Sequence, residues 1–300
     1  MSMFPLTVPA FRRRFPRFDW RTGVILSIVL LGAGVMASLP RLAQPSAFHH
    51  FADTRAWLGV PNFMDVVSNA PFALASLLGL VNLRRRGRSE RASVAGAMLP
   101  LMAIDRMCLV ALFVGMGLTA LGSSYYHLAP GNERLFWDRL PMVLTFVSLL
   151  ATLVAERVSP KTAAWLLGPL LMAGATSLVY WEHTEHMGQG DLRPYFLIEG
   201  AALVSVLLVV TLYTARYLPT RWLMLGLGCY AGAVVLEQLD RVVWHLWDGL
   251  GVALVSGHTL KHLSAGAGAL VLAWMIEARP ARQADLTIRR EMARYTKPRP

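Results

Sequence analysis

The stretch Ser256–His262 (SGHTLKH) opens the last long apolar segment of the chain, which ends near Ile276. A run of this length with few charges is typical of a helix that crosses a membrane. Residues four apart lie on one face of a helix, so His258 and His262 can reach a single metal ion. Two ligands are too few for a stable site, and the remaining ligands must come from elsewhere in the chain.

The composition favours a membrane protein. Of the 300 residues, 55% are hydrophobic and only 16% are charged, whereas a soluble domain carries about 25% charged residues. The net charge of +11 comes from short clusters between apolar runs, a pattern that indicates membrane topology and no nucleic-acid partner. Both cysteines, Cys108 and Cys229, lie in apolar segments, so we expect neither a disulfide framework nor a cysteine-based zinc site.

The apolar runs predict an all-α, polytopic membrane helix bundle. We expect eight membrane-crossing helices, at about residues 23–39, 61–83, 105–128, 138–155, 162–181, 194–213, 221–245 and 256–276. The first run also has the features of a signal peptide, so cleavage after it is the alternative to an uncleaved helix.

The arginine and lysine clusters give the expected topology. They occur before the first run and after the second, fourth, sixth and eighth, and the loops between them are poor in both residues. The positive-inside rule then places both termini in the cytoplasm. The arginine-rich style of the chain is bacterial, so we expect an integral protein of a bacterial inner membrane.

This topology brings five polar residues to one depth. The third helix runs outward and carries Ser123 and His127 near its outer end, while the fourth begins with Asp138 at that same level. The eighth runs inward, which puts His258 and His262 in its outer turns. Polar groups inside a membrane usually face the bundle interior or a wet cavity, so a shared site towards the outer, periplasmic leaflet is predicted.

The five residues have the chemistry of a hydrolytic metal site. Three neutral imidazoles, from His127, His258 and His262, leave a fourth position open on a catalytic zinc ion. Asp138 could hold the attacking water and take its proton, and Ser123, one turn from His127, could donate to the developing oxyanion. Each residue also has a plainer interpretation: an interface histidine, a small contact residue, or an aspartate that caps a helix or pairs with its neighbour Arg139.

Four stretches carry a resemblance to a known family. They are Pro61–Asn69 (PNFMDVVSN), Gly122–His127 (GSSYYH), Trp137–Met142 (WDRLPM) and Ser256–His262. Together they resemble the alkaline ceramidase family, within the wider group of seven-helix hydrolases that includes adiponectin-receptor-type proteins. The family pattern is a serine four residues before a histidine, an aspartate eleven residues after it, and a late pair of histidines four residues apart.

The resemblance implies a seven-helix domain at residues 53–278, preceded by a basic N-terminus, an extra helix and an outer linker (1–52) and followed by a basic tail (279–300). It implies a zinc amidase that releases a fatty acid from an N-acyl lipid of the ceramide type. His127, His258 and His262 would be the metal ligands, Asp138 the base and Ser123 the oxyanion donor. The family's acidic calcium cluster is not matched here, which makes Ca²⁺ doubtful.

Two other classes of function stay open at this point. One is a heptahelical receptor or scaffold in which the zinc is only structural. The other is a metal or proton transporter, suggested by Glu237 and Asp240 in the seventh run. The expected partner is a membrane lipid, and the sequence does not define an oligomeric state.

Several further polar residues have two interpretations. His183 and His186 could bind a second metal, or lie in a solvated loop. Asp191, Arg193 and Tyr195 could meet a lipid head group, or form a local ion pair. Glu237, Asp240 and Arg241 could form an internal ion pair that fixes helix packing, or support the site. Lys261 could extend to the membrane interface, or contact an anionic lipid.

Overall fold

The computed structural model describes residues 19–92, 103–252 and 254–277, and this part of the chain is an all-α helical bundle. Its helices are α1 (Trp20–Ser38), α2 (Phe63–Val67), α3 (Ala70–Ala92), α4 (Ala103–Leu128), α5 (Asn132–Leu153), α6 (Pro160–His186), α7 (Arg193–Leu212), α8 (Thr220–Gln238), α9 (Asp240–Gly249) and α10 (Gly257–Glu277). Two short turns complete it, the 3₁₀ turn η1 (Ser46–His49) and the π-helical turn η2 (Val154–Val158).

The prediction of a polytopic membrane bundle is confirmed. In the described residues, 7 helices are long and apolar enough to cross a membrane, or up to 8 if α8 and α9 count as one span. Each predicted apolar run is helical, as one helix or as two in succession, because a long apolar segment in a bilayer must satisfy its backbone hydrogen bonds within itself. The basic N-terminus before residue 19 and the tail 279–300 lie outside the described residues.

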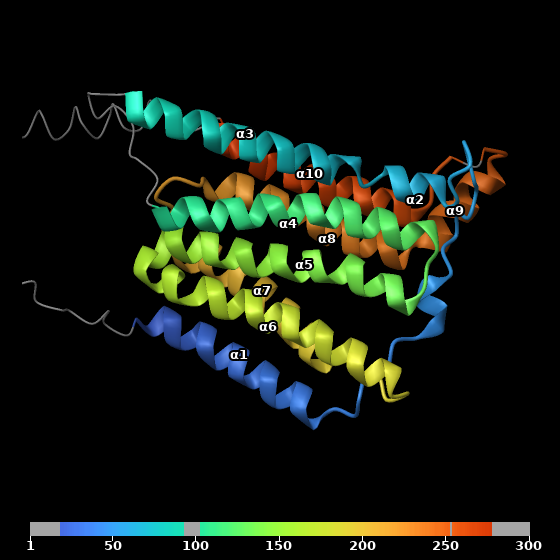
Figure 1. The fold of residues 1–300 in the computed structure, drawn as a ribbon, viewed down its shortest axis with the longest axis horizontal. Coiled ribbons are helices and arrows are strands. Elements are labelled where there is room, and N and C mark those ends of the chain that lie inside the picture. Colours follow the sequence, from blue (N-terminus) through green and yellow to red (C-terminus); the bar gives the residue numbers. More distant parts are fainter. Residues whose placement is uncertain (1–18, 93–102, 253, 278–300) are drawn as a thin grey trace, which may run out of the picture.

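The long helices alternate in direction along one axis (Figure 1). The start of α1 and the end of α10 lie at one end of the bundle, and the turn from α4 to α5, helix α9 and the segment between α1 and α2 lie at the other. We call the second the histidine end, because the three histidines of the predicted site lie there. The segment of residues 39–62 that crosses this end is called the connector.

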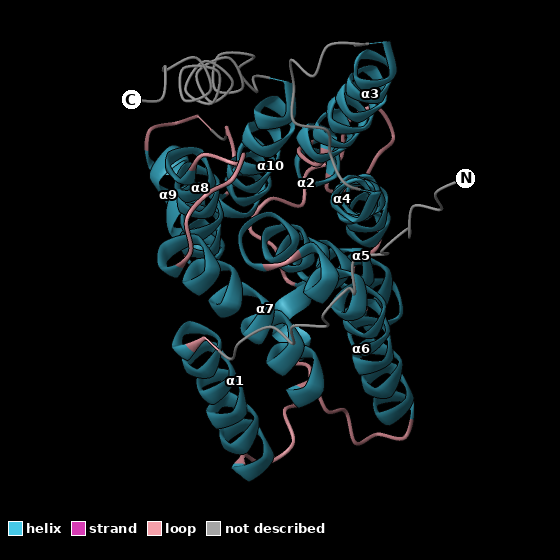
Figure 2. Ribbon diagram, turned by 90° about the vertical axis from the view of Figure 1, so that its left-hand side faces the viewer, coloured by secondary structure: helices cyan, strands magenta, loops and turns pink. Residues whose placement is uncertain are grey.

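Successive contacts join α3, α4, α5, α7, α8 and α10 into a closed ring, which can be followed in the view along the axis (Figure 2). The most extensive interfaces join α4 to α5 and α8 to α10, and α10 also packs on α3. Helix α6 lies outside α5 and α7, and α1 packs on α7 at the periphery. No residue of α1 is buried, so the seven-helix core does not enclose this extra helix.

Two glycines allow the helices that carry the predicted site to approach closely. A Cβ atom on Gly122 would lie 2.0 Å from the carbonyl oxygen of Trp137, so α4 and α5 touch backbone to backbone. A Cβ on Gly257 would lie 2.5 Å from the carbonyl oxygen of Leu236, where α10 begins against the end of α8. Only glycine fits such contacts.

Several predicted boundaries were wrong. Helix α3 continues to Ala92, past the expected end near residue 83, and α5 begins at Asn132, before the expected start near residue 138. Helix α6 continues to His186, where a polar loop was expected, because polar side chains can continue a helix once it leaves the apolar layer. The seventh run is not one helix but breaks between α8 and α9 with a bend of 70°. At the break, Asp240 accepts a hydrogen bond from the backbone N–H of His258 (2.8 Å), so its carboxylate caps the start of α10.

A charged pair holds the opposite end of the bundle together. Glu156 and Arg157 in η2 have fully buried side chains, and Nε of Arg157 lies 2.9 Å from Oε2 of Glu156. The other carboxylate oxygen accepts from three backbone N–H groups of residues 216–218. Arg157 donates to the carbonyl oxygens of Val210, Tyr213 and Leu218. The pair therefore fixes the connection between α7 and α8.

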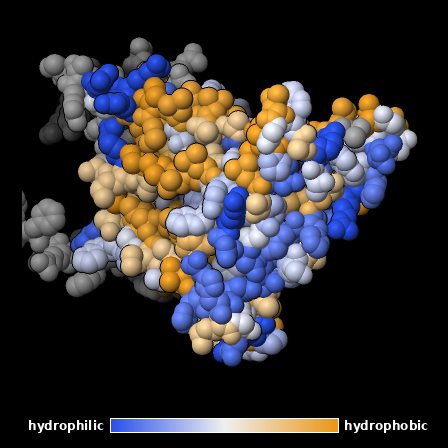
Figure 3. Space-filling view, turned by 45° about the vertical axis from the view of Figure 1, so that its right-hand side comes forward, coloured by the Kyte–Doolittle hydropathy of each residue, from blue (hydrophilic) through white to orange (hydrophobic). Residues whose placement is uncertain are grey.

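The surface divides along the same axis. Hydrophobic side chains cover a broad area of the helical body, and hydrophilic ones gather towards the histidine end (Figure 3). Exposed apolar residues such as Leu30, Leu121 and Trp165 are between 69% and 75% accessible. An apolar band of this kind suits the hydrocarbon of a bilayer.

Candidate metal centre and cavity

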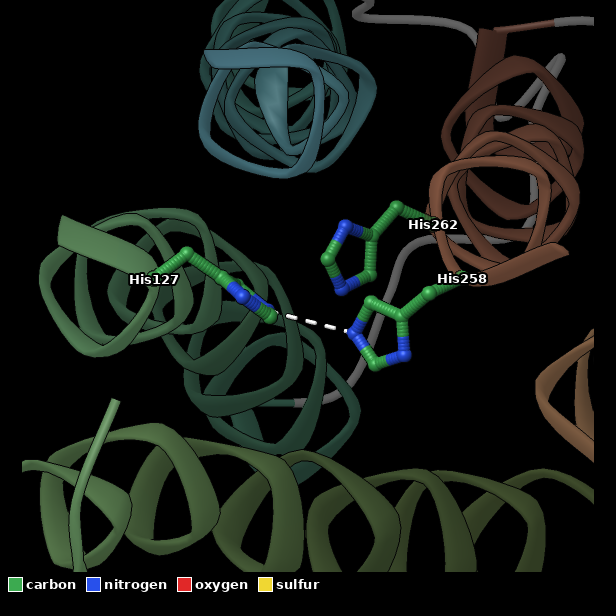
Figure 4. A group of neighbouring side chains, drawn as sticks. All are labelled: His127, His258 and His262. Carbon is green, nitrogen blue, oxygen red and sulfur yellow. Dashed lines mark hydrogen bonds between the residues drawn. The ribbon is translucent and has the colours of Figure 1, made fainter. Parts of the chain in front are cut away.

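Three buried imidazoles meet at the histidine end. His127 comes from the last turn of α4, and His258 and His262 come from the first two turns of α10. The three rings point towards one another across the gap between the two helices (Figure 4). One ring nitrogen from each lies within 4.8 Å of the others. The structure thus brings together the three ligands predicted from sequence, although α10 packs mainly on α3 and α8 and the side chains cross to α4.

The spacing of the rings fits a tetrahedral metal ion. Nε2 of His127 lies 3.2 Å from Nε2 of His258. Two nitrogens bound at about 2.0–2.1 Å to one tetrahedral zinc would lie about 3.3 Å apart. In addition, Nδ1 of His127 is buried and has no hydrogen-bond partner in the described part of the chain. The spacing of this pair and the limit of 4.8 Å for the whole group show that the three histidines could hold one metal ion.

The hydrogen bonds around His262 orient its ring for this role. The Ser68 hydroxyl lies 2.8 Å from Nδ1 of His262 and donates its proton to the carbonyl oxygen of Asp65 at 3.2 Å. The hydroxyl has one proton, so if it is donated to Asp65, Nδ1 of His262 is the donor in the first contact. Nε2 then keeps its lone pair for a metal, as is usual when a ligand histidine has a second hydrogen bond.

A phenylalanine of the connector covers two of the three imidazoles. The ring of Phe51 lies 4.7 Å from that of His127 and 4.4 Å from that of His258, between centroids. Next to it, the N–H of Ala52 donates to Oδ2 of Asp240 (2.9 Å), whose other oxygen accepts from the N–H of His258. One carboxylate therefore fixes both the connector and the helix that carries two of the histidines.

Asp138 and Ser123 lie beside the histidine group. Both are buried, and the Ser123 hydroxyl is hydrogen-bonded to the Asp138 carboxyl. They line the same cavity as His258 and His262, but Asp138 is not one of the group whose ligand atoms lie within 4.8 Å of one another. The arrangement leaves the three imidazoles as ligands and keeps a carboxylate and a hydroxyl facing the same space.

The cavity runs from the histidine end into the bundle. Its volume is about 1120 Å³, which is large enough for a drug-sized or lipid-like molecule. Near the histidines its wall includes Asp138, Arg139, Glu237 and Lys261. Deeper in the bundle the wall is apolar, and includes Leu149, Leu153, Val210, Leu223 and Leu272. One polar end and one long apolar end suit a molecule with the same division.

The structure places the other polar residues that had two interpretations in the sequence. Lys261 lies in the cavity wall and pairs with Glu237 at 2.5 Å, instead of extending to the interface. The ion pair expected within residues 237–241 is thus replaced by one between helices.

At the start of α7, Asp191 forms the local ion pair with Arg193 (2.8 Å). The hydrogen bonds that the Arg193 side chain donates lower the pKa of the Asp191 carboxyl to about 2. His183 and His186 lie on α6, and the described residues contain no metal-binding group that includes them.

Sequence reasoning did not assign roles to Phe51, Ser68 or Arg139. Phe51 lies in the connector, where no periodic pattern indicates what it covers. Ser68 follows a turn after α2 and gives no signal that it supports His262. Arg139 stands next to Asp138 on a helix that was expected to be a simple span, and a charge within an apolar helix was the one available signal.

The comparisons with known proteins leave the family unassigned. No model of a known protein family matches the chain, and no functionally characterised protein matches it significantly. The case for a function therefore depends on the geometry of the site.

Proposed function

We infer that the protein is a zinc-dependent membrane hydrolase that cleaves the amide bond of an N-acyl lipid of the ceramide type and releases a fatty acid. The observation that carries this proposal is the group of three imidazoles, of which His258 and His262 line the polar end of a cavity whose other end is apolar. Zn²⁺ suits three histidine ligands with an open position. When bound, it acidifies water and polarises a carbonyl group.

The residues of the chain would divide the remaining work. The apolar wall around Leu149 and Leu223 would hold the acyl chain and so position the amide at the histidine end. Asp138 would accept a proton from the attacking water and return it to the departing amine. The Ser123 hydroxyl would donate a hydrogen bond to the oxyanion. Phe51, over two of the imidazoles, would limit the access of bulk water.

A metal assay on the purified full-length protein tests the first step. We expect about one zinc per chain and a fall to background in the double variant His258→Ala/His262→Ala. His186→Ala is the matched control, because His186 lies on α6 outside the group, and it should keep the metal. Zinc content that is unchanged in the double variant would reject this site.

A hydrolysis assay tests the second step. Zinc-loaded protein should release fatty acid from an N-acyl lipid, and the double variant should not. A protein that keeps its zinc but turns over no N-acyl lipid would instead be a receptor or scaffold with a structural metal. The apolar inner wall of the cavity counts against a transporter, because an ion would find no polar path there.

A further inference from the structure

Arg139 is a buried arginine in the cavity wall with an unused donor. The residue is 6% exposed and lines the cavity on the side of α5. Its Nη1 atom is buried and has no hydrogen-bond partner in the described part of the chain. A guanidinium carries five N–H donors and stays charged at any pH that a protein tolerates. A buried charge is normally paired, so such a group requires an explanation.

Aromatic rings surround the guanidinium. Its central carbon lies 5.2 Å from the ring centroids of Phe48, Trp181 and Tyr195, which come from the connector and from the histidine-end turns of α6 and α7. Cation–π contacts of this kind hold the plane of an arginine in place but do not satisfy its N–H groups. The cage therefore fixes the side chain at the cavity and leaves Nη1 without an acceptor.

The nearby carboxyl groups feel the charge of Arg139 but accept no hydrogen bond from its Nη1 atom. Asp138 is hydrogen-bonded to Ser123, and Glu199 to Tyr195. Arg157, on the same helical segment, differs from Arg139 in its acceptors. Three carbonyl oxygens and a carboxylate surround its guanidinium. Both terminal nitrogens of Arg157 thus have acceptors, whereas Nη1 of Arg139 has none in the described residues.

The position of Arg139 determines which part of a bound N-acyl lipid would contact it. An acyl chain along the apolar wall and an amide at the histidines leave the amine portion of the molecule at the histidine end. Arg139 directly follows Asp138 and lies under the connector residue Phe48. Arginine forms strong, directional bonds with carboxylates and phosphates.

We propose that Arg139 binds an anionic oxygen group, a carboxylate or a phosphate ester, on the amine portion of the N-acyl substrate. The proposal rests on the hydrolase function above and narrows its substrate class. Within the N-acyl lipids of the ceramide type, neutral members such as ceramide itself would be poorer substrates than acidic ones. A neutral hydroxyl can also accept a hydrogen bond, but an anionic oxygen binds a charged guanidinium more strongly.

Three probes with the same acyl chain test the proposal: N-dodecanoylglycine (a carboxylate), the phosphate ester of N-dodecanoylethanolamine, and neutral N-dodecanoylethanolamine. With zinc-loaded full-length protein, kcat/KM for one acidic probe should exceed that for the neutral probe by about 10- to 100-fold, as expected for hydrogen bonds to a charged group. The better acidic probe distinguishes a carboxylate from a phosphate. A wild-type protein that favours the neutral probe would overturn the proposal.

Variants then show whether Arg139 causes the preference. Arg139→Gln should lower the acidic-to-neutral ratio by about 10- to 100-fold, and Arg139→Lys, which keeps the charge, should retain part of it. Arg134→Gln is the matched control, since it removes a positive charge from the same end of α5 without touching the cavity; the ratio should not change. An equal loss on all three probes in both Arg139 variants would indicate a purely structural arginine.

A binding measurement separates this inference from the hydrolase proposal. If zinc-loaded protein cleaves none of the probes, hydrolysis is rejected, and the affinity of each probe for wild type and for Arg139→Lys is measured by fluorescence displacement. Tighter binding of an acidic probe, reduced in the variant, would support an anion site without hydrolysis. Equal binding of acidic and neutral probes would reject it.

Discussion

One helical segment, α5 with η2, carries two buried acid–arginine pairs, Asp138–Arg139 at the histidine end and Glu156–Arg157 at the opposite end. Eighteen residues separate them, about five turns of helix, so both pairs lie on nearly the same face. Glu156 and Arg157 bind each other and the backbone around them. Asp138 and Arg139 face a cavity, and Nη1 of the arginine has no partner in the described residues.

The difference shows how to interpret a charge inside an apolar helix. A buried ion pair that is also hydrogen-bonded to the backbone around it fixes a structure, and the removal of one partner is costly because the other is left unpaired. A buried charge that is left incomplete beside a cavity does not stabilise the free protein. Such a charge can instead contact a ligand or a reacting atom. Mutation of the fully paired charge should therefore lower stability and leave turnover unchanged, whereas mutation of the incomplete one should lower turnover without lowering stability.

The largest expected effect is on turnover, in Asp138→Asn. The amide keeps the shape and the contact with Ser123 but cannot accept a proton, so kcat should fall by about 10²- to 10⁴-fold. Thermal stability should stay the same or rise, because a buried charge is removed. The measurement is fatty-acid release together with the melting temperature of the zinc-loaded protein. A variant that is unstable but fully active per folded molecule would mean that Asp138 has a structural role and is not the catalytic base.

The matched change at the other pair is Glu156→Gln. It leaves Arg157 without its counter-charge in a fully buried site, so the free energy of unfolding should fall by about 3–5 kcal/mol. Turnover per folded molecule should be unchanged, since the pair lies far from the histidines. Denaturant unfolding in detergent gives the stability, and the zinc content identifies the folded fraction. A loss below about 1 kcal/mol would mean that this pair is not structural.

The smallest effect is expected at a third acid–arginine pair, Asp191 and Arg193, where the arginine is 24% exposed. The pKa of the Asp191 carboxyl is lowered to about 2 from about 3.9 in an unfolded chain. Its contribution to stability is therefore present above about pH 4 and is lost as the pH falls towards 2. Asp191→Asn should lower the melting temperature slightly at pH 7, and the difference from wild type should vanish near pH 2. A difference that persists at pH 2 would exclude this ion pair as its cause.

The fold could be predicted from sequence because length and hydropathy dominate in a membrane. Apolar runs and the intervening arginine clusters located every long helix. They missed the end of α3 at Ala92, the start of α5 at Asn132, the extension of α6 to His186, and the breaks after α2 and near Asp240. The break near Asp240 depends on a carboxylate that caps a helix eighteen positions further along the chain. A local pattern does not contain that information.

The metal-binding group could be predicted because depth in the bundle restricts which residues can meet. His127, His258 and His262 were predicted at one depth in the membrane. In the structure, one ring nitrogen of each lies within 4.8 Å of the other two. The roles of Arg139 and Arg157 could not be separated, because both follow an acidic residue in the same helical segment. What distinguishes them is the presence of partners from α7 and the loop to α8, which only the packed structure reveals.

The connector has a consequence for how the chain tolerates changes in length. Surface segments usually accept insertions and deletions. This one is held at the carbonyl oxygen of Leu42 by the N–H of Leu192, and at Ala52 by Asp240. Between these two anchors it must place Phe48 on Arg139 and Phe51 on the imidazoles. One added or deleted residue would shift both rings out of register. The length of the segment from Leu42 to Ala52, ten residues along the chain, therefore sets the positions of both rings at the site.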